Sequence, residues 1–363
     1  MADWHLIDDL LLIAHKNGAS DLILRTDDRV RMRIHGQIVT IAPKKIPPQS
    51  RKMIKAMIEH TMRLMSNKID IEREHSLDYH YSLENVAHFR MHIFHTRNNF
   101  GIVARIIPKA IPTFEDLKLP PITQAISALR NGLVLVAGAT GSGKSTTLAA
   151  ILQYVIKNRP AHVITMEDPI EFCYDSKYQG TVTQREIGRD VESYNQGLHD
   201  ALREAPDLIM AGEARSPEVI QLSLTAAETG HLVMATVHAT SAIGTLQRLT
   251  ASFPLDQQKI IRDRLGENLR AIIVQKLLPK KNGKGRVAVF EIMIRTSVVK
   301  HFIFDPGRWS EIPKAMEDGH DLFGSQSFDQ CLQQLVETEQ VDYDEAINHA
   351  IYPEEFSMRM GRD

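Results

Sequence analysis

One octapeptide constrains this chain more than any other feature, because it matches the pattern GxxxxGK[ST] at every fixed position. It consists of Gly138, Ala139, Thr140, Gly141, Ser142, Gly143, Lys144 and Ser145. The apolar run Leu133–Ala137 precedes it, and the helix-compatible stretch Thr146–Ile156 follows it. The pattern predicts a buried strand, a tight loop and a helix, with backbone N–H groups of the loop and the helix N-terminus directed at phosphate oxygens. The alternative is a glycine-rich turn that binds nothing, and the matching context on both sides argues against it.

Each side chain of this loop has an expected role in nucleotide binding. Lys144 is placed to reach the β- and γ-phosphates, and the Ser145 hydroxyl to ligate magnesium. Thr146, the next residue, is expected near the α-phosphate. The expected cofactors are therefore ATP and Mg²⁺.

A nucleotide site of this kind also needs a carboxylate at the end of a neighbouring strand, to orient water or to hold the metal. The apolar run Leu208–Ala211 leads through Gly212 to Glu213, which is our candidate for orienting the attacking water. The aspartate that usually precedes such a glutamate is absent, since position 212 is glycine.

A second acidic group follows the strand-like run Ile164–Met166 and comprises Glu167, Asp168 and Glu171. Asp168-Pro169 can be interpreted simply as a turn initiator. Beside a phosphate loop, however, three carboxylates within five residues favour a magnesium or water site. We expect Glu171 to act directly, and the metal ligands to be Ser145, Glu171 and Glu213.

Two histidines, His231 and His238, flank the apolar run Leu232–Val237. A histidine at a strand end is commonly a satisfied polar residue, and the functional alternative is that the pair senses the γ-phosphate. The arginines allow a similar choice between a solvated face and an arginine finger that reaches a neighbouring subunit's ATP. Candidates for the finger are Arg90, Arg97 and Arg105, with Arg189, Arg203 and Arg215 as alternative sources of the same charge.

Hydrophobic patterns divide the chain into two domains. Residues 1–107 combine a helix at 3–17, a helix at about 49–65 and short alternating segments typical of an antiparallel sheet, so we expect a small α+β domain. Pro108 and Pro112 interrupt regular structure in a linker, residues 108–115. In residues 116–363, buried apolar strands alternate with helices, which predicts an α/β layer with a largely parallel sheet and a helical C-terminal region.

Composition excludes several classes of protein. The net charge of −2 provides no global basic field for nucleic acid or anionic membranes. The two cysteines, Cys173 and Cys331, are far apart and form no CxxC pair, so we expect neither a disulfide framework nor a structural zinc site. The N-terminus has no signal-peptide pattern and no apolar stretch is long enough to span a membrane, so we expect a cytosolic protein.

The ordered set of motifs resembles the PilT group of secretion-superfamily ATPases. In that group, residues 138–145, 164–171, 207–213 and 231–238 correspond to the Walker A, Asp-box, Walker B and His-box motifs. Residues 18–22 and 33–36 resemble its N-terminal PAS-like domain. The stretches at 184–190, 201–203 and 224–231 resemble its RecA-like domain.

This resemblance implies a RecA-like P-loop NTPase domain with a smaller PAS-like α+β domain, assembled as a homohexamer that holds ATP between subunits. It also implies retraction of a type IV pilus through an inner-membrane platform protein. The motor would then sit at the cytoplasmic face of the inner membrane, through its partner and without contact to nucleic acid. Assembly motors of the superfamily are usually longer at the N-terminus and carry a four-cysteine zinc site. The absence of both features here favours retraction.

Departures from the group's pattern occur at Ile23, Ala205, the pair Arg215-Ser216 and the segment Ser297–His301. These departures are compatible with a main retraction motor, an accessory paralogue or a motor for a related secretion or plasmid-transfer system. Two further alternatives are a nucleic-acid translocase and a ring scaffold that binds ATP without hydrolysing it. The basic cluster at 276–286 has no aromatic residues and is interpreted as a solvated loop, and the intact Glu213 argues against the scaffold.

Overall fold

The computed structural model describes residues 5–34, 37–41, 48–63, 70–84, 86–107, 110–175, 177–283 and 285–361. The chain forms two compact units. The first comprises residues 1–111 together with 166–175 and 184–193, and the second comprises residues 112–165, 176–183 and 194–363. The sequence pattern places 166–175 and 184–193 within the nucleotide domain, whereas in the structure these segments pack with the first unit. Pro108 and Lys109 of the predicted linker lie outside the described residues.

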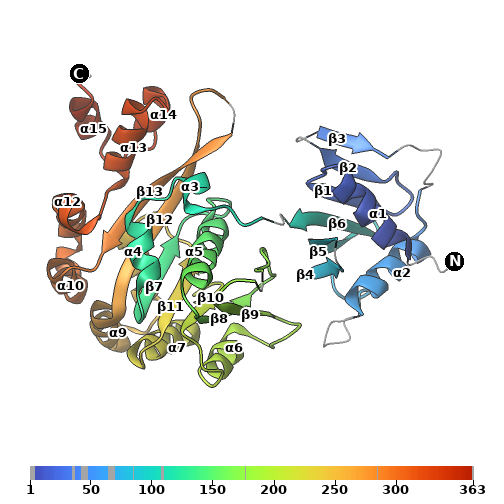
Figure 1. The fold of residues 1–363 in the computed structure, drawn as a ribbon, viewed down its shortest axis with the longest axis horizontal. Helices are drawn as coiled ribbons and strands as arrows, with labels where there is room; N and C mark the ends of the chain where they lie inside the picture. The colour runs from blue at the N-terminus through green and yellow to red at the C-terminus, as the bar shows by residue number, and fades with distance from the viewer. Residues whose placement is uncertain are drawn as a thin grey trace. The chain divides into compact units, whose positions relative to one another are not determined.

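The first unit contains an antiparallel sheet with the strand order β3-β2-β1-β6-β5-β4 and two helices (Figure 1). Its elements are α1 His5–Lys16, β1 Asp21–Arg25, β2 Arg31–Ile34, β3 Gln37–Thr40, α2 Arg51–Met62, β4 Ser76–Leu83, β5 Ala87–Thr96 and β6 Asn99–Ile107. Alternate strand residues and the apolar faces of both helices form one buried cluster. The predicted α+β layout is confirmed, because the period-2 and helical patterns each bury one face.

The opposite, polar face of the β4–β5 hairpin explains why distant segments join the first unit. His80 on β4 pairs with Arg90 on β5, and His88 lies diagonally from His80 on the same face. The carboxylate of Glu186, only 1% exposed, accepts the His80 N–H at 3.0 Å and the Ile170 N–H at 3.2 Å. One buried carboxylate thus ties residues 166–175 and 184–193 to the hairpin.

The second sheet has the strand order β13-β12-β7-β11-β10-β8-β9. The strands are β7 Gly132–Ala137, β8 His162–Glu167, β9 Thr181–Glu186, β10 Leu208–Ala211, β11 Leu232–Val237, β12 Leu269–Pro279 and β13 Arg286–Ile294. β12, β7, β11 and β10 run parallel, and β13 pairs antiparallel with β12. β7 and β11 are buried along their whole length, so the continuous apolar runs predicted the central strands correctly.

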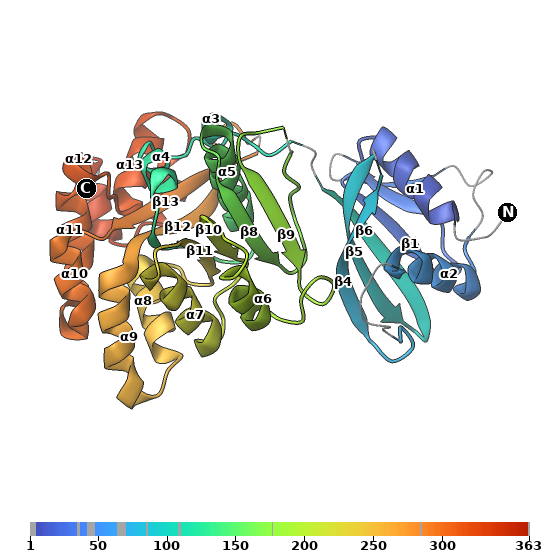
Figure 2. The same cartoon turned by 60° about the horizontal axis from the view of Figure 1, so that its bottom comes forward.

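Helices cover this sheet on both faces. After β7 the chain crosses the sheet to β8 and then returns through β10 and β11, so right-handed crossovers place α5 on one face and α6 and α7 on the other. Figure 2 shows this arrangement. The helices between Phe114 and Asn268 are α3 Phe114–Leu117, α4 Ile122–Ala128, α5 Lys144–Asn158, α6 Tyr194–Ala201, α7 Pro217–Glu228, α8 Ala242–Ala251 and α9 Leu255–Asn268.

The C-terminal region is helical, as predicted. Its elements are α10 Ser297–Phe304, the 3₁₀-helix Pro306–Glu311, α11 Ile312–Asp318, α12 His320–Phe323, α13 Phe328–Glu337, α14 Tyr343–Ile347 and α15 Pro353–Arg359. Two sequence interpretations were incomplete. β9 was not predicted, and Lys276 belongs to β12 instead of a solvated loop. Among the described residues, no helix is both long and apolar enough to cross a bilayer.

Candidate active site

The octapeptide forms a tight loop between β7 and α5, and two of its glycines, Gly138 and Gly143, are required by space as well as by backbone angle. Gly138 and Gly143 have φ of 152° and 92°. A Cβ atom at Gly138 would lie 2.5 Å from the Gln275 carbonyl oxygen, and one at Gly143 would lie 2.7 Å from Gln275 Nε2. Gly143 also caps α5, so the loop ends at the positive end of a helix that begins with Lys144.

Lys144 lies inside the loop. Its Nζ donates to the carbonyl oxygens of Gly138 and Ala139, both at 2.9 Å, and the residue is 8% exposed. Within the described residues, Ser142 Oγ is buried without a hydrogen-bond partner and the Ser145 hydroxyl makes no side-chain hydrogen bond. A curved loop, a helix N-terminus, an ammonium and two hydroxyls match what nucleotide phosphates and their magnesium ion need.

Gln275, which belongs to none of the sequence motifs, supports this loop from β12. The side chain is 4% exposed, and its Oε1 accepts a hydrogen bond from Thr147 Oγ1 at 2.7 Å. Gln275 thereby connects α5 to the neighbouring strand while filling the space beside Gly143. A glutamine inside the apolar run Ala271–Leu278 was a usable signal, because buried amides need hydrogen-bond partners.

Glu213 follows Gly212 at the carboxyl end of β10, which is separated from β7 by β11. Carboxyl ends of parallel strands meet at one edge of a sheet, so Glu213 lies on the edge that carries the phosphate loop. Its side chain is 14% exposed and forms an ion pair with Arg215, and His238 Nε2 lies 3.3 Å from Glu213 Oε1. The second unit therefore contains the predicted carboxylate at the sheet edge that carries the phosphate loop.

The two predicted histidines lie at opposite ends of β11. Val237 is paired with Ala137, so His238 follows β11 at the phosphate-loop edge. His231 precedes the same strand, about 20 Å away at ~3.3 Å per residue. Its Nδ1 lies 3.1 Å from the Ala226 carbonyl oxygen. The expectation that His231 senses the γ-phosphate in its own nucleotide domain is not supported, because the whole length of β11 separates His231 from the phosphate-loop edge.

Glu171 belongs to the first unit together with the rest of the predicted acidic group. Its Oε1 lies 3.4 Å from Arg90 Nη1 on β5. Gln184 Nε2 donates to Glu167 Oε1 at 3.0 Å. A magnesium-binding role for Glu171 therefore stays a prediction, and within the first unit this carboxylate is paired with an arginine.

The candidate arginine fingers differ in how they are held. Arg97 is exposed in the two-residue turn between β5 and β6, at a φ of 50°. Arg105 on β6 donates from Nε to Asp21 at 3.0 Å, and 67% of its side chain is exposed. Among the alternatives, Arg215 contacts Glu213, whereas Arg203 precedes β10 and so lies at the amino edge of the sheet.

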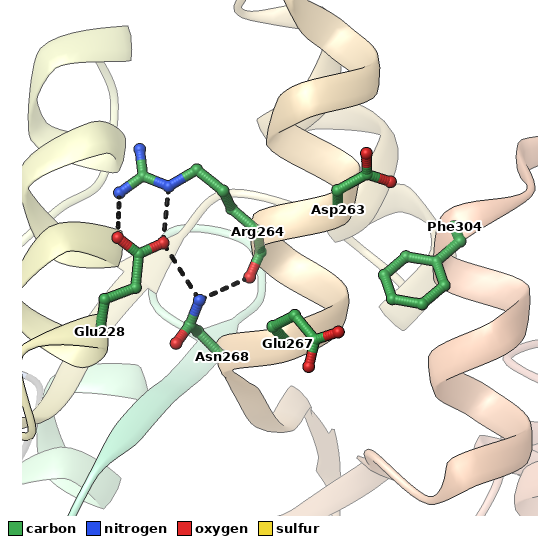
Figure 3. A pocket seen from close by; sticks show the side chains of 6 residues that line it. All are labelled: Glu228, Asp263, Arg264, Glu267, Asn268 and Phe304. Atoms are coloured by element: carbon green, nitrogen blue, oxygen red, sulfur yellow. Dashed lines mark hydrogen bonds and ion pairs between the residues drawn. The ribbon is translucent and has the colours of Figure 1, made fainter.

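A shallow hollow of about 630 Å³ opens elsewhere in the second unit (Figure 3). It is lined by Glu228, Asp263, Arg264, Glu267, Asn268 and Phe304. Figure 3 shows the Arg264 guanidinium against the Glu228 carboxylate, to which it donates at 2.7 and 2.8 Å. Both α7 and α9 end here, just before β11 and β12 begin, so the hollow lies at the amino edge of the sheet and is not the nucleotide site.

Comparison with known proteins agrees with this geometry. The type II/IV secretion system protein family matches residues 4–304. The type IV pilus retraction ATPase PilT of Pseudomonas aeruginosa is 40% identical over 96% of this chain and 99% of its own length. The type IV pilus ATPase PilU of the same organism is 37% identical over 94% of this chain and 88% of its own.

A solved structure extends the likeness to the fold. The crystal structure of the pilus retraction motor PilT with bound ADP has a TM-score of 0.84 and 34% identity, and the match covers 96% of this chain and 98% of that one. The ATPase DotB of Legionella pneumophila has a TM-score of 0.81 at 27% identity, covering 98% and 95% of the two chains. The chain therefore belongs to the type II/IV secretion system protein family and is a PilT-like ATPase with a RecA-like nucleotide domain.

Proposed function

We propose that this ATPase works as a homohexameric ring that retracts a type IV pilus, at the cytoplasmic face of the inner membrane and through a membrane platform protein. The observation that supports the proposal best is the pairing of Glu213 with His238 at the sheet edge that carries the phosphate loop. The similarity to PilT over 96% of the chain favours filament retraction over other mechanical uses of ATP hydrolysis.

In the proposed chemistry, ATP binds in the loop with its terminal phosphates inside the ring of backbone N–H groups. Lys144 exchanges its two carbonyl acceptors for the β- and γ-phosphates, and the Ser145 hydroxyl is a magnesium ligand. A magnesium ion held there would neutralise the negative charge that develops on the phosphates during hydrolysis. Glu213 orients water, and His238 beside it reports the presence of the γ-phosphate to β11.

Glu171 and the arginines complete the proposal from the first unit. Glu171 contributes to the metal or water site once it exchanges its ion pair with Arg90. Arg97 or Arg105 reaches the nucleotide of the neighbouring subunit, where a cation would stabilise the transition state. Arg97→Ala or Arg105→Ala should then lower hydrolysis in trans. Mixing either variant with Lys144→Ala subunits should restore part of the activity, and no restoration at any ratio would contradict the assignment.

The nucleic-acid translocase is less well supported. Lys276 does not extend into solvent as part of a basic loop, because its ammonium packs 4.3 Å from the centroid of the Phe328 ring. Burial lowers the pKa of Lys276. Hydrolysis that rises severalfold on addition of single-stranded DNA, and not with platform protein, would favour the translocase.

The nucleotide site is tested by hydrolysis and binding measured on the same variants. Lys144→Ala should abolish phosphate release, whereas Lys259→Ala, on the exposed face of α9, should leave it unchanged. Glu213→Gln should still bind a fluorescent ATP analogue while turnover falls by a factor of about 10² or more. Wild-type turnover by Lys144→Ala would overturn the site, and loss of binding in Glu213→Gln would make Glu213 structural.

The filament is tested in the bacterium that encodes the chain. Deletion of the gene should abolish twitching and leave pili extended, and complementation with the wild-type chain, but not with Glu213→Gln, should restore movement. Deletion strains with unchanged twitching and pilus number would overturn the retraction proposal while leaving the ATPase intact.

A further inference from the structure

Three side chains from distant parts of the sequence converge in the first unit, outside the nucleotide site. His80 on β4, His88 on β5 and Cys173 in the segment 166–175 place one potential ligand atom each within 4.8 Å of the others. His80 Nε2 lies 3.1 Å from His88 Nδ1 and 3.9 Å from Cys173 Sγ. In the described part of the chain this is the single group of three such ligands at that spacing.

These separations are close to those of a tetrahedral zinc site. With Zn–N near 2.0–2.1 Å and Zn–S near 2.3 Å, tetrahedral angles place two nitrogens ~3.3 Å apart and a nitrogen and a sulfur ~3.6 Å apart. The distances of 3.1 Å from His80 Nε2 to His88 Nδ1 and of 3.9 Å from His80 Nε2 to Cys173 Sγ differ from these values by a few tenths of an ångström. The ligand atoms of all three residues lie within 4.8 Å of one another, and rotation of the side chains would bring them around one ion.

The backbone on both sides of the cluster is already held in place. Pairing of β4 with β5 places His80 and His88 diagonally on one face. Glu186 accepts the His80 N–H and the Ile170 N–H, so the same carboxylate joins β4 to the segment that carries Cys173. A site whose ligands are positioned before binding loses less conformational entropy when the ion arrives.

The two imidazoles are stacked, with ring centroids 5.1 Å apart. A neutral imidazole offers one nitrogen lone pair to a metal ion. His80 Nδ1 is buried without a partner in the described structure, so Nε2 is the nitrogen that points at the other ligands.

We propose that His80, His88 and Cys173 form a binding site for a thiophilic divalent metal ion, with zinc as the expected occupant. Two imidazoles and a thiolate with one position left for water are a ligand set that zinc accepts. The CxxC spacing sought in the sequence was absent because the ligands come from three separate segments. Binding converts the Cys173 thiol to a thiolate and releases one proton to solvent.

Binding would connect the segment 166–175, through Cys173, to the two histidines of the β4–β5 hairpin, in addition to the Glu186 contacts. That segment also carries Glu171, whose ion pair with Arg90 joins the same hairpin. The ion would therefore restrain the movement of Glu171. The metal site itself does not depend on the proposed motor function and can be tested without hydrolysis.

Cobalt(II) is a suitable probe, because a thiolate ligand and tetrahedral geometry each give it a distinct absorption. Titration of the untagged, full-length chain should produce a thiolate-to-cobalt charge-transfer band and visible d–d bands, saturating at one ion per chain. Zinc should then displace the cobalt. Cys173→Ser should remove the charge-transfer band, whereas Cys331→Ser, the matched control at the other cysteine, should retain it.

Affinity for zinc, measured by competition with a chromophoric chelator, provides a second readout. His88→Ala should weaken binding by at least the ~10–100-fold typical of losing an outer-shell partner, whereas His349→Ala, at an exposed position just after α14, should not. Zinc should also raise the melting temperature of the wild-type chain and not that of Cys173→Ser. Absence of the charge-transfer band in the folded wild-type chain, or its persistence in Cys173→Ser, would overturn the proposal.

Discussion

A buried glutamate beneath α8 predicts a specific pH dependence of stability. Glu291 on β13 is 8% exposed, and its Oε2 accepts the Ala242 N–H at 2.9 Å. Burial raises the pKa of Glu291 from 4.5 to about 7, and Asp329 adds to this, while the Ala242 bond and Lys276 oppose it. The carboxyl group is therefore protonated in the folded chain at pH values where it is ionised in the unfolded chain.

The sign and size of the effect follow from linkage. Between pH 4.5 and about 7 the folded state binds more protons than the unfolded state at this site, so the free energy of unfolding falls as pH rises through this window and is flat above it. At 1.36 kcal/mol per pKa unit, the whole shift corresponds to about 3 kcal/mol. About 2 to 3 kcal/mol of this is expected between pH 5 and pH 8.

Glu291→Gln removes the titration and keeps an amide oxygen for the Ala242 N–H. Urea unfolding, followed by Trp309 fluorescence in a Trp4→Phe background, measures the second unit. The stability of Glu291→Gln relative to the parent should rise by about 2 to 3 kcal/mol from pH 5 to pH 8. Glu337→Gln, at the exposed end of α13, should show no such change. Parallel pH profiles of Glu291→Gln and its parent would refute the reasoning.

Three further predictions follow from contacts in the second unit. Gly143→Ala should fold but lose binding of a fluorescent ATP analogue, because φ at this position is 92° and the new methyl group would lie 2.7 Å from the side-chain amide nitrogen of Gln275. Unchanged affinity would contradict this geometry. His238→Ala should lower hydrolysis, whereas His231→Ala, at the other end of β11, should keep it in a phosphate-release assay; equal losses would show that His231 acts on the nucleotide. Gly266→Ala should lower stability by about 1–3 kcal/mol in urea unfolding, because its Cβ would lie 2.3 Å from the Phe304 ring. A neutral result would mean that α9 and α10 separate at little cost.

Elements whose evidence is local were predictable from the sequence. The phosphate loop is a contiguous motif in which the glycines, the lysine and the serine each have a defined role. The apolar run before it and the helix-compatible stretch after it supply the context that the motif requires. Leu133–Ala137 and Leu232–Val237 are continuous apolar runs because both faces of β7 and β11 are buried. Glu213 could be placed at the end of its strand by the same reasoning. β9 was missed because Thr181–Glu186 is an edge strand whose more buried face includes the polar residues Gln184 and Glu186, so no apolar alternation appears in the sequence.

Tertiary structure alone decided which distant residues meet. It places Gln275 against the loop, separates His231 from His238 by the length of β11, and joins Cys173 to His80 through the segments tied by Glu186. Sequence periodicity shows whether a side chain faces a core, because burial repeats with the backbone. Periodicity does not indicate which strand or loop packs against that side chain, because strand order and the paths of the connecting segments depend on contacts summed over the whole chain.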